Sequence, residues 1–313
     1  MMNYLERFLT LCLFFLLLVT PLLIHEGFAR DSSSAARSLA VPRRIVSLAP
    51  SVTETLFALG LGDRLVGVTA YCDYPPQAQK LPKIGDFVSP NIEAILAKKP
   101  DLVIGVAGAT DLGKAKEMER LGLKVFLVSV TNLSDILISI RSIARRLGNQ
   151  EAGEKLVMRI GAQVQEVKKR IERAPRRPAL FVVGIRPLVA AGRKNFIDEL
   201  ITLAGGKNIV GNVSQPWLNL PEEYVVAKAP QVIIEAGMGS EREDSTKRWA
   251  DLKSVPAVRE GRIYSYPSDK ILRPGPRFGE ALAELARLIH PECFAKPSNR
   301  KGNEESRCES SKP

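Results

Sequence analysis

The chain has 313 residues, of which 45% are hydrophobic and 25% charged, and it carries a formal net charge of +11. This composition excludes a disordered or collagen-like protein and is sufficient for one or two packed domains. The basic residues are scattered, and no aromatic residues interleave the denser basic patches. A nucleic-acid-binding surface is therefore not expected, and a solvated basic surface is.

The N-terminus has the pattern of a secretory signal peptide. A basic residue, Arg7, precedes an uncharged run over 8–24, and Gly27 and Ala29 are spaced as at a signal-peptidase site. We therefore expect residues 1–29 to be removed on export. A run of this length is also near the lower limit for a retained membrane anchor. The small polar residues over 30–43 predict a flexible leader.

The first half of the folded chain alternates strands and helices. The pattern predicts strands over 44–48, 65–69, 102–106 and 124–128, and helices over 52–59 and 111–121. Ser51 is the expected N-cap of the first helix. A proline-rich loop, 71–76, follows the second strand. This order predicts a mainly parallel sheet in an N-terminal lobe, residues 44–131.

The next segment, 132–175, has no strand pattern. Helices are expected over 133–147 and 151–173, and the second would be about 35 Å long at 1.5 Å per residue. A flexible linker would be rich in Gly and Ser, so this segment predicts a rigid helical connection between two lobes. The same helix is also compatible with a crossover inside a single domain.

The second half repeats the alternation and predicts a C-terminal lobe, residues 176–291. Expected elements are strands over 178–184, 232–234 and 262–266, helices over 195–204, 246–252 and 278–289, a loop over 185–192 and a connection over 255–258. The polar tail, 292–313, is expected to be disordered. Three cysteines remain after export; Cys293 and Cys308 would close a short disulfide loop, with Cys72 a free thiol.

Two stretches, 87–104 and 217–234, are similar to each other at a constant offset of 130 residues. Identical residues recur at Glu93/Glu223, Ala97/Ala227, Lys98/Lys228, Pro100/Pro230 and Ile104/Ile234. Each copy opens on an aromatic residue, Phe87 or Trp217, and reads as loop, short helix, proline and buried strand. The repeat predicts two similar lobes with matching side chains.

The sequence contains no pattern that requires catalysis. After export the chain keeps one histidine, His290, expected at a helix end, and it has no G-x-S-x-G, phosphate-loop or C-x-x-C motif. A transition-metal site would need several His or Cys ligands. We therefore predict a binding protein that is not an enzyme and has no cofactor or metal of its own.

Aromatic residues mark the expected binding site. Loops at the carboxyl ends of the strands carry Tyr71, Tyr74, Phe87, Trp217 and Asp269. Aromatic side chains bury a large area with few rotatable bonds, which suits a large flat ligand. Each of them alone also fits ordinary packing; the matched pair favours ligand walls.

The two matched glutamates suit a different role. Each begins a short helix, where the helix dipole alone favours a carboxylate. Glu93 and Glu223 together also suit docking to a two-fold symmetric partner, with one carboxylate for each subunit and arginine as its mate.

At these residues the chain resembles the periplasmic substrate-binding proteins for cobalamin and ferric siderophores. The resemblance covers residues 44–290 and rests on Arg44–Glu54, on Asn91–Ile104 and on the loop Tyr71–Pro76, whose Tyr-x-Asp-Tyr-Pro-Pro pattern is similar to that of the cobalamin-binding members. It implies an α/β fold of two similar lobes with mainly parallel sheets joined by a long rigid helix, with little hinge closure.

The resemblance also implies the ligand and the partner. A monomeric periplasmic receptor would bind cobalamin or a related corrinoid between Tyr71, Phe87 and Trp217, with Asp269 in the second lobe's loop. It would deliver this ligand to the permease dimer of an ABC importer through Glu93 and Glu223. Phe87 and Val189 depart from the cobalamin pattern. A ferric siderophore or haem is the alternative ligand, with Arg186 and Arg273 as partners for an anion.

Overall fold

The computed structural model describes residues 41–295 except 185–186, 237–248 and 267–269, and these residues belong to one compact unit. The helices are α2 (Pro50–Ala58), α3 (Pro76–Gln79), α4 (Ile92–Ala97), α5 (Leu112–Arg120), α6 (Leu133–Arg146), α7 (Gln150–Arg170), α8 (Phe196–Leu203), α9 (Glu222–Lys228), α11 (Pro256–Arg259) and α12 (Phe278–Ile289), with 3₁₀ turns η1 (Gly62–Arg64) and η2 (Pro291–Cys293). The strands are β1 (Ile45–Ser47), β2 (Leu65–Val68), β3 (Leu102–Val106), β4 (Val125–Val128), β5 (Arg177–Gly184), β6 (Val189–Ala191), β7 (Gly206–Asn208), β8 (Trp217–Asn219), β9 (Val232–Glu235) and β10 (Ile263–Ser265).

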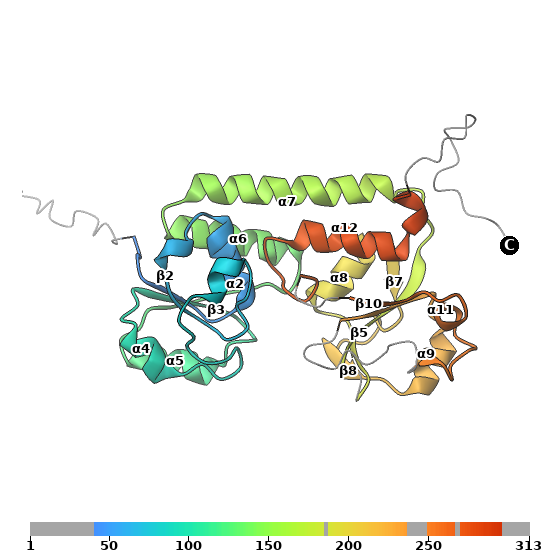
Figure 1. Ribbon diagram of the computed structural model, residues 1–313, viewed down its shortest axis with the longest axis horizontal. Helices are drawn as coiled ribbons and strands as arrows, with labels where there is room; N and C mark the ends of the chain where they lie inside the picture. Colours follow the sequence, from blue (N-terminus) through green and yellow to red (C-terminus); the bar gives the residue numbers. More distant parts are fainter. Residues whose placement is uncertain (1–40, 185–186, 237–248, 267–269, 296–313) are drawn as a thin grey trace, which may run out of the picture. The chain divides into compact units, whose positions relative to one another are not determined.

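The strands form two sheets (Figure 1). The first has the order β2-β1-β3-β4, and all of its strands are parallel. The second has the order β10-β9-β5-β6-β8, with β7 also on β5. In it β5, β7, β9 and β10 are parallel, whereas β6 runs antiparallel to β5 and β8. The α/β architecture with mainly parallel sheets agrees with the prediction.

Both sheets are covered on both faces. Along β1 and β3, Ile45 and Ile104 belong to one hydrophobic cluster while Val46 and Val103 belong to another. Because successive side chains of a strand point to opposite faces, two cores per sheet result. In β5 the same alternation places Phe181 in the first cluster and the neighbouring side chains in a third.

One of these clusters is continuous between the two sheets. It contains Ile45 of the first sheet, Phe181 of the second, and residues of α6, α7 and α12. Figure 1 shows α7 running alongside α6 and α12, and the residue contacts agree. A hydrogen bond between α6 and α8 reinforces the junction: the backbone N–H of Leu133, which begins α6, donates to Oε2 of the Glu199 side chain in α8 at 2.6 Å. The long helix is therefore packed along its length, as expected of a rigid connection.

The internal repeat is present in the structure. Asn91 caps α4 by accepting from the N–H of Ala94, and Pro221 occupies the corresponding place before α9. Each copy then has a non-glycine residue with positive φ just before its proline: Lys99 at 44° and Ala229 at 45°. This conformation is uncommon outside glycine, so its recurrence at the same offset confirms that the two copies share a backbone path.

Several local predictions were wrong. Ala49, rather than Ser51, occupies the N-cap of α2, because Pro50 at the first helical position begins the helix two residues earlier than expected. Part of the expected loop 185–192 is strand β6, and the second repeat copy opens on strand β8 instead of a loop. The expected connection over 255–258 contains the short helix α11.

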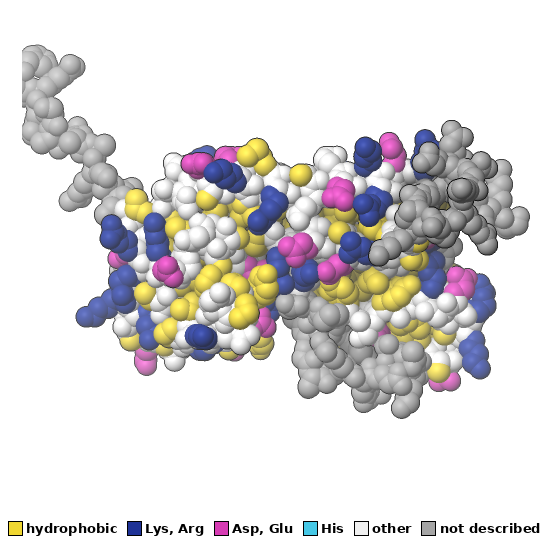
Figure 2. All heavy atoms as spheres, turned by 45° about the horizontal axis from the view of Figure 1, so that its top comes forward, with side chains coloured by type: hydrophobic (Ala, Val, Ile, Leu, Met, Phe, Trp, Pro, Cys, Tyr) yellow, Lys and Arg dark blue, Asp and Glu magenta, His cyan; other side chains and the backbone are white. Residues whose placement is uncertain are grey.

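The predicted signal peptide, residues 1–29, lies outside the described residues, as do most of the leader and of the C-terminal tail. Among the residues that are described, no helix is long and apolar enough to cross a membrane. Figure 2 shows basic and acidic side chains interspersed over the face it presents, which fits the predicted solvated surface. Cys293 is disulfide-bonded, and Cys72 is a buried free thiol.

Candidate functional site

A loop at the carboxyl end of β2 carries the most exposed aromatic residues of the first sheet. The side chains of Tyr71 and Tyr74 are 60% and 41% exposed, whereas Cys72 between them is buried. Its sulfur lies 3.1 Å from Oγ1 of Thr53 and 3.2 Å from Oγ1 of Thr69. The buried thiol anchors the loop and leaves both tyrosine rings toward solvent, at the sheet edge where α/β proteins bind ligands.

Arg273 contacts this loop from the segment that precedes α12. Its Nη1 donates to Oδ1 of Asp73 at 2.5 Å, and its Nη2 donates to the carbonyl of Tyr71 at 3.2 Å. Burial raises the pKa of Asp73, but the hydrogen bond and charge of Arg273 outweigh it and lower that pKa overall. Burial likewise opposes the charge on Arg273, and Asp73 and Glu54 together raise its pKa.

Two residues that the sequence did not single out complete the cluster. Glu54 of α2 has a side chain only 1% exposed, and Arg277 holds it in a bidentate pair, Nε to Oε2 at 2.7 Å and Nη2 to Oε1 at 2.6 Å. Arg273 adds a third bond to Oε1 at 3.1 Å. Because two cations face the two carboxylates of Glu54 and Asp73, the charge of Arg273 is matched within the protein.

Phe87 lies in a tight loop between α3 and α4. An isolated bridge between Gly85 and Pro90 closes this loop, and Phe87 is partly buried against the main hydrophobic cluster. Its neighbour Val88 is 73% exposed, which makes Val88 the more accessible apolar side chain there.

Trp217 begins β8 at the edge of the second sheet. It pairs with Ala191 of β6 and is 44% exposed. Gly192 makes this pairing possible, because a Cβ at that position would collide with the carbonyl of Gln215 and lie 2.7 Å from Leu218. The exposed indole is thus presented by a hydrogen-bonded strand pair rather than by a free loop.

Glu93 and Glu223 occupy equivalent positions. Each is the second residue of its helix, α4 or α9, and each is exposed. Within the part of the chain that the structure describes, neither carboxylate has a hydrogen-bond or ion-pair partner. Both side chains are therefore available to an external partner.

Two of the predicted site residues, Arg186 and Asp269, lie outside the described residues. Among those described, no group of three or more His, Cys, Asp and Glu side chains could hold a metal ion. His290 follows α12 at the helix end, as predicted, and is fully buried. Its Nδ1 lies 3.1 Å from Glu292 and its Nε2 lies 3.2 Å from the carbonyl of Gly205.

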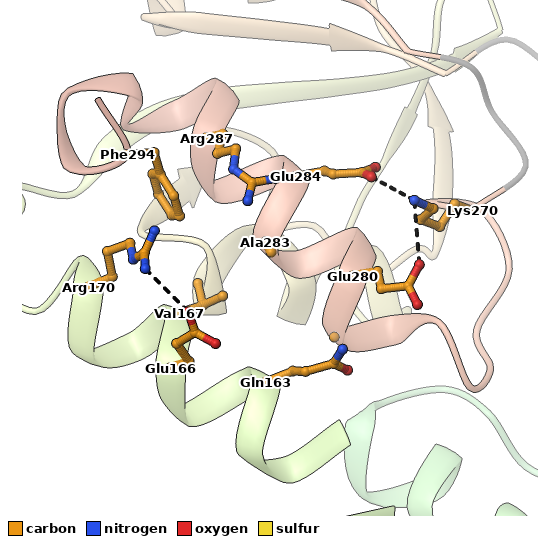
Figure 3. A pocket seen from close by; sticks show the side chains of 11 residues that line it. Gln163, Glu166, Val167, Arg170, Lys270, Glu280, Ala283, Glu284, Arg287 and Phe294 are labelled. Carbon is orange, nitrogen blue, oxygen red and sulfur yellow. Dashed lines mark hydrogen bonds and ion pairs between the residues drawn. The ribbon is translucent and has the colours of Figure 1, made fainter. Parts of the chain in front are cut away.

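A separate pocket of about 250 Å³ lies between α7 and α12 (Figure 3). Its charged side chains pair with one another: Lys270 binds Glu284 at 2.6 Å and Glu280 at 3.5 Å, and Arg170 binds Glu166 at 3.3 Å. Burial raises the pKa of Glu284, although Arg287 opposes the shift. Because its charges are balanced internally, this pocket is a weaker ligand site than the aromatic surfaces.

The comparisons with known proteins agree with one another over most of the chain. Residues 45–270 match a family model described as periplasmic binding protein. A vitamin B12-binding protein of Yersinia pestis is 30% identical over 215 residues, which is 69% of this chain and 77% of that protein.

Two solved structures are similar in fold and in sequence. The periplasmic vitamin B12-binding protein of Vibrio cholerae aligns with a TM-score of 0.72 at 27% identity, covering 82% of this chain and 99% of that one. A periplasmic haem-binding protein of a Roseiflexus species aligns with a TM-score of 0.73 at 29% identity, covering 80% and 99%.

Proposed function

Because the chain belongs to the periplasmic binding protein family, we propose that it captures a corrinoid of the vitamin B12 type and delivers it to an ABC importer. As a member of this family it is a binding protein and not an enzyme. We propose that residues 1–29 direct its export and are then removed, and that it works as a monomer.

Exposed aromatic side chains carry the ligand assignment. Tyr71 and Tyr74 belong to one sheet's loops and Trp217 to the edge of the other, and all three are at least 41% exposed. Soluble proteins usually bury such side chains in cores, so their exposure here favours stacking against a large apolar ring system. The charge-matched state of Arg273 favours a ligand that needs no ionic partner, which suits a corrinoid better than an anionic siderophore.

The first test is titration of the protein, residues 30–313, with cyanocobalamin by calorimetry. Saturable binding of one ligand per chain is the expected result. An absence of heat at high ligand concentration would refute the corrinoid assignment and direct the search to ferric siderophores and haem.

Replacing Trp217 by alanine should weaken cyanocobalamin binding about tenfold or more, or about 1.4 kcal/mol, as loss of an aromatic anchor does. Met158→Ala is the control, because this substitution also removes an exposed apolar side chain. Met158 is 63% exposed and lies on α7, which carries none of the predicted ligand-binding residues. Equal affinity of the Trp217 and Met158 variants would remove the indole from the site.

Haem is the second candidate, favoured by the Roseiflexus relative and by the exposed phenol of Tyr71. Tyrosine is an established axial ligand of haem iron in proteins, and ligation requires the hydroxyl, whereas stacking requires only the ring. Under the corrinoid proposal, Tyr71→Phe should keep cyanocobalamin affinity within about threefold, because the ring survives.

The same variant, titrated with haemin and followed by its absorption spectrum, separates the two ligands. Haemin bound by the unmodified protein, with ligation lost in Tyr71→Phe and kept in Tyr74→Phe, would establish haem instead.

A further inference from the structure

A five-residue segment, Arg273–Arg277, connects the start of α12 to the first sheet's site loop. Its sequence is Arg-Pro-Gly-Pro-Arg, with an arginine at each end. The two prolines restrict its backbone. A Cβ on Gly275 would lie 3.4 Å from Ser51 of α2, in ordinary van der Waals contact. The segment therefore rests on α2, and its two arginine side chains are only 13% and 8% exposed.

The two arginines fix consecutive residues of the loop. Arg273 binds the carbonyl of Tyr71 and the carboxylate of Asp73. Arg277 places its guanidinium 3.9 Å from the centre of the Tyr74 ring, where a cation attracts the aromatic face. With Cys72 buried between them, every residue of Tyr71–Tyr74 is held, although both tyrosine rings remain exposed.

Glu54 sets the position of both arginines. It accepts three hydrogen bonds from them and is itself fixed on α2, which begins directly after β1. An ion pair that served stability alone would need one arginine for this carboxylate. The second arginine extends the contact outward to Asp73, which is half exposed at the edge of the site.

We propose that Arg273 and Arg277 are positioning residues, which hold the backbone of Tyr71 and the ring of Tyr74 in the arrangement that receives the ligand. This inference rests on the proposed function, because it says that the ligand affinity of the tyrosine loop depends on side chains of a segment distant in the sequence. The arginines affect ligand binding through the orientation of the Tyr74 ring and the position of the Tyr71 backbone.

The test compares Arg273→Gln with the unmodified protein by two measurements. Hydrogen–deuterium exchange without ligand should rise at least about tenfold in peptides covering 71–76, because the bonds from Arg273 to Asp73 and to the Tyr71 carbonyl are lost and loss of a single charged hydrogen bond already has an effect of about this size. Peptides from β3 should stay protected. The Kd for cyanocobalamin, measured by calorimetry, should rise by a similar factor. Arg273→Lys keeps the charge without the planar fork and should recover only part of both losses.

Arg177→Gln is the matched control. Arg177 is also a partly buried arginine paired with a glutamate, Glu292 at 3.1 Å, but it contacts the end of α12. Its variant should leave both the exchange of 71–76 and the ligand affinity unchanged. Because Glu54 keeps Arg277 as a partner in Arg273→Gln, this variant is expected to fold, which its melting temperature checks.

Each outcome decides the proposal. Unchanged exchange over 71–76 in Arg273→Gln would overturn it, and so would faster exchange with unchanged affinity. If the unmodified protein binds haemin and not cyanocobalamin, the corrinoid assignment fails, and the same variants then test the positioning role with haemin. If it binds neither, the proposed function fails, which the unmodified protein alone reveals.

Discussion

Replacing Glu93 and Glu223 together by arginine should abolish corrinoid uptake in cells while leaving the Kd of the purified protein unchanged. Both carboxylates are exposed at equivalent helix positions, and neither has a partner among the described residues. If each meets an arginine of a permease subunit, the reversal turns two attractive contacts into repulsive ones, which costs several kcal/mol for like charges in an interface. Uptake of labelled cyanocobalamin by cells that depend on this protein measures the effect.

The control reverses two other exposed carboxylates and changes the net charge equally. Glu119→Arg with Glu222→Arg alters exposed residues on α5 and α9, and Glu222 is adjacent to Glu223 on the same helix. Uptake should persist in this control, because only matched positions engage a symmetric partner. Loss of ligand binding in the Glu93/Glu223 variant, or equal loss of uptake in the control, would refute the docking role.

Glu54→Gln should lower the free energy of unfolding by about 3–5 kcal/mol, the loss expected when one member of a buried ion pair is removed. The substitution keeps the shape of the side chain but leaves Arg277, which is 8% exposed, without its full counter-charge. Urea denaturation followed by circular dichroism measures the change as a shift in midpoint at constant slope.

Glu154→Gln provides the contrast. Glu154 also accepts two hydrogen bonds from one arginine, Arg141, at 2.9 and 3.0 Å, but these side chains are 53% and 39% exposed. Solvent screening limits such a surface pair to about 1 kcal/mol or less. Equal losses for the two variants would show that burial of Glu54 does not strengthen its pairing.

Long elements were predictable because their signals are local. The apolar run of β3 and the helical spacing along α7 each decide burial within a single segment, and Asn132 and Asn195 cap α6 and α8 as such residues do. The three-residue strands β6, β7 and β8 were missed. Gly206-Lys207-Asn208 has no alternation to detect, and it is a strand only because β5 supplies a partner.

The candidate site was predictable in part for the same reason. The aromatic loop and the paired glutamates follow from local pattern and from the repeat. The Glu54 cluster depends on residues separated by 219 and 223 positions, and no local signal specifies that contact. One indication was available: Glu54 lies between Val52 and Leu56 on the buried part of α2, and a buried carboxylate requires a cationic partner.

The long sequence separation of these contacts has a consequence for the order in which the protein matures. Contacts between residues far apart in the sequence form slowly, because the loop-closure entropy is lost before such contacts contribute to stability. The loop of Tyr71 and Tyr74 is complete only when the segment Arg273–Arg277, about two hundred residues later, has reached α2. An incompletely folded or truncated chain therefore lacks a finished tyrosine loop, and on the proposed function it does not withhold ligand from complete molecules.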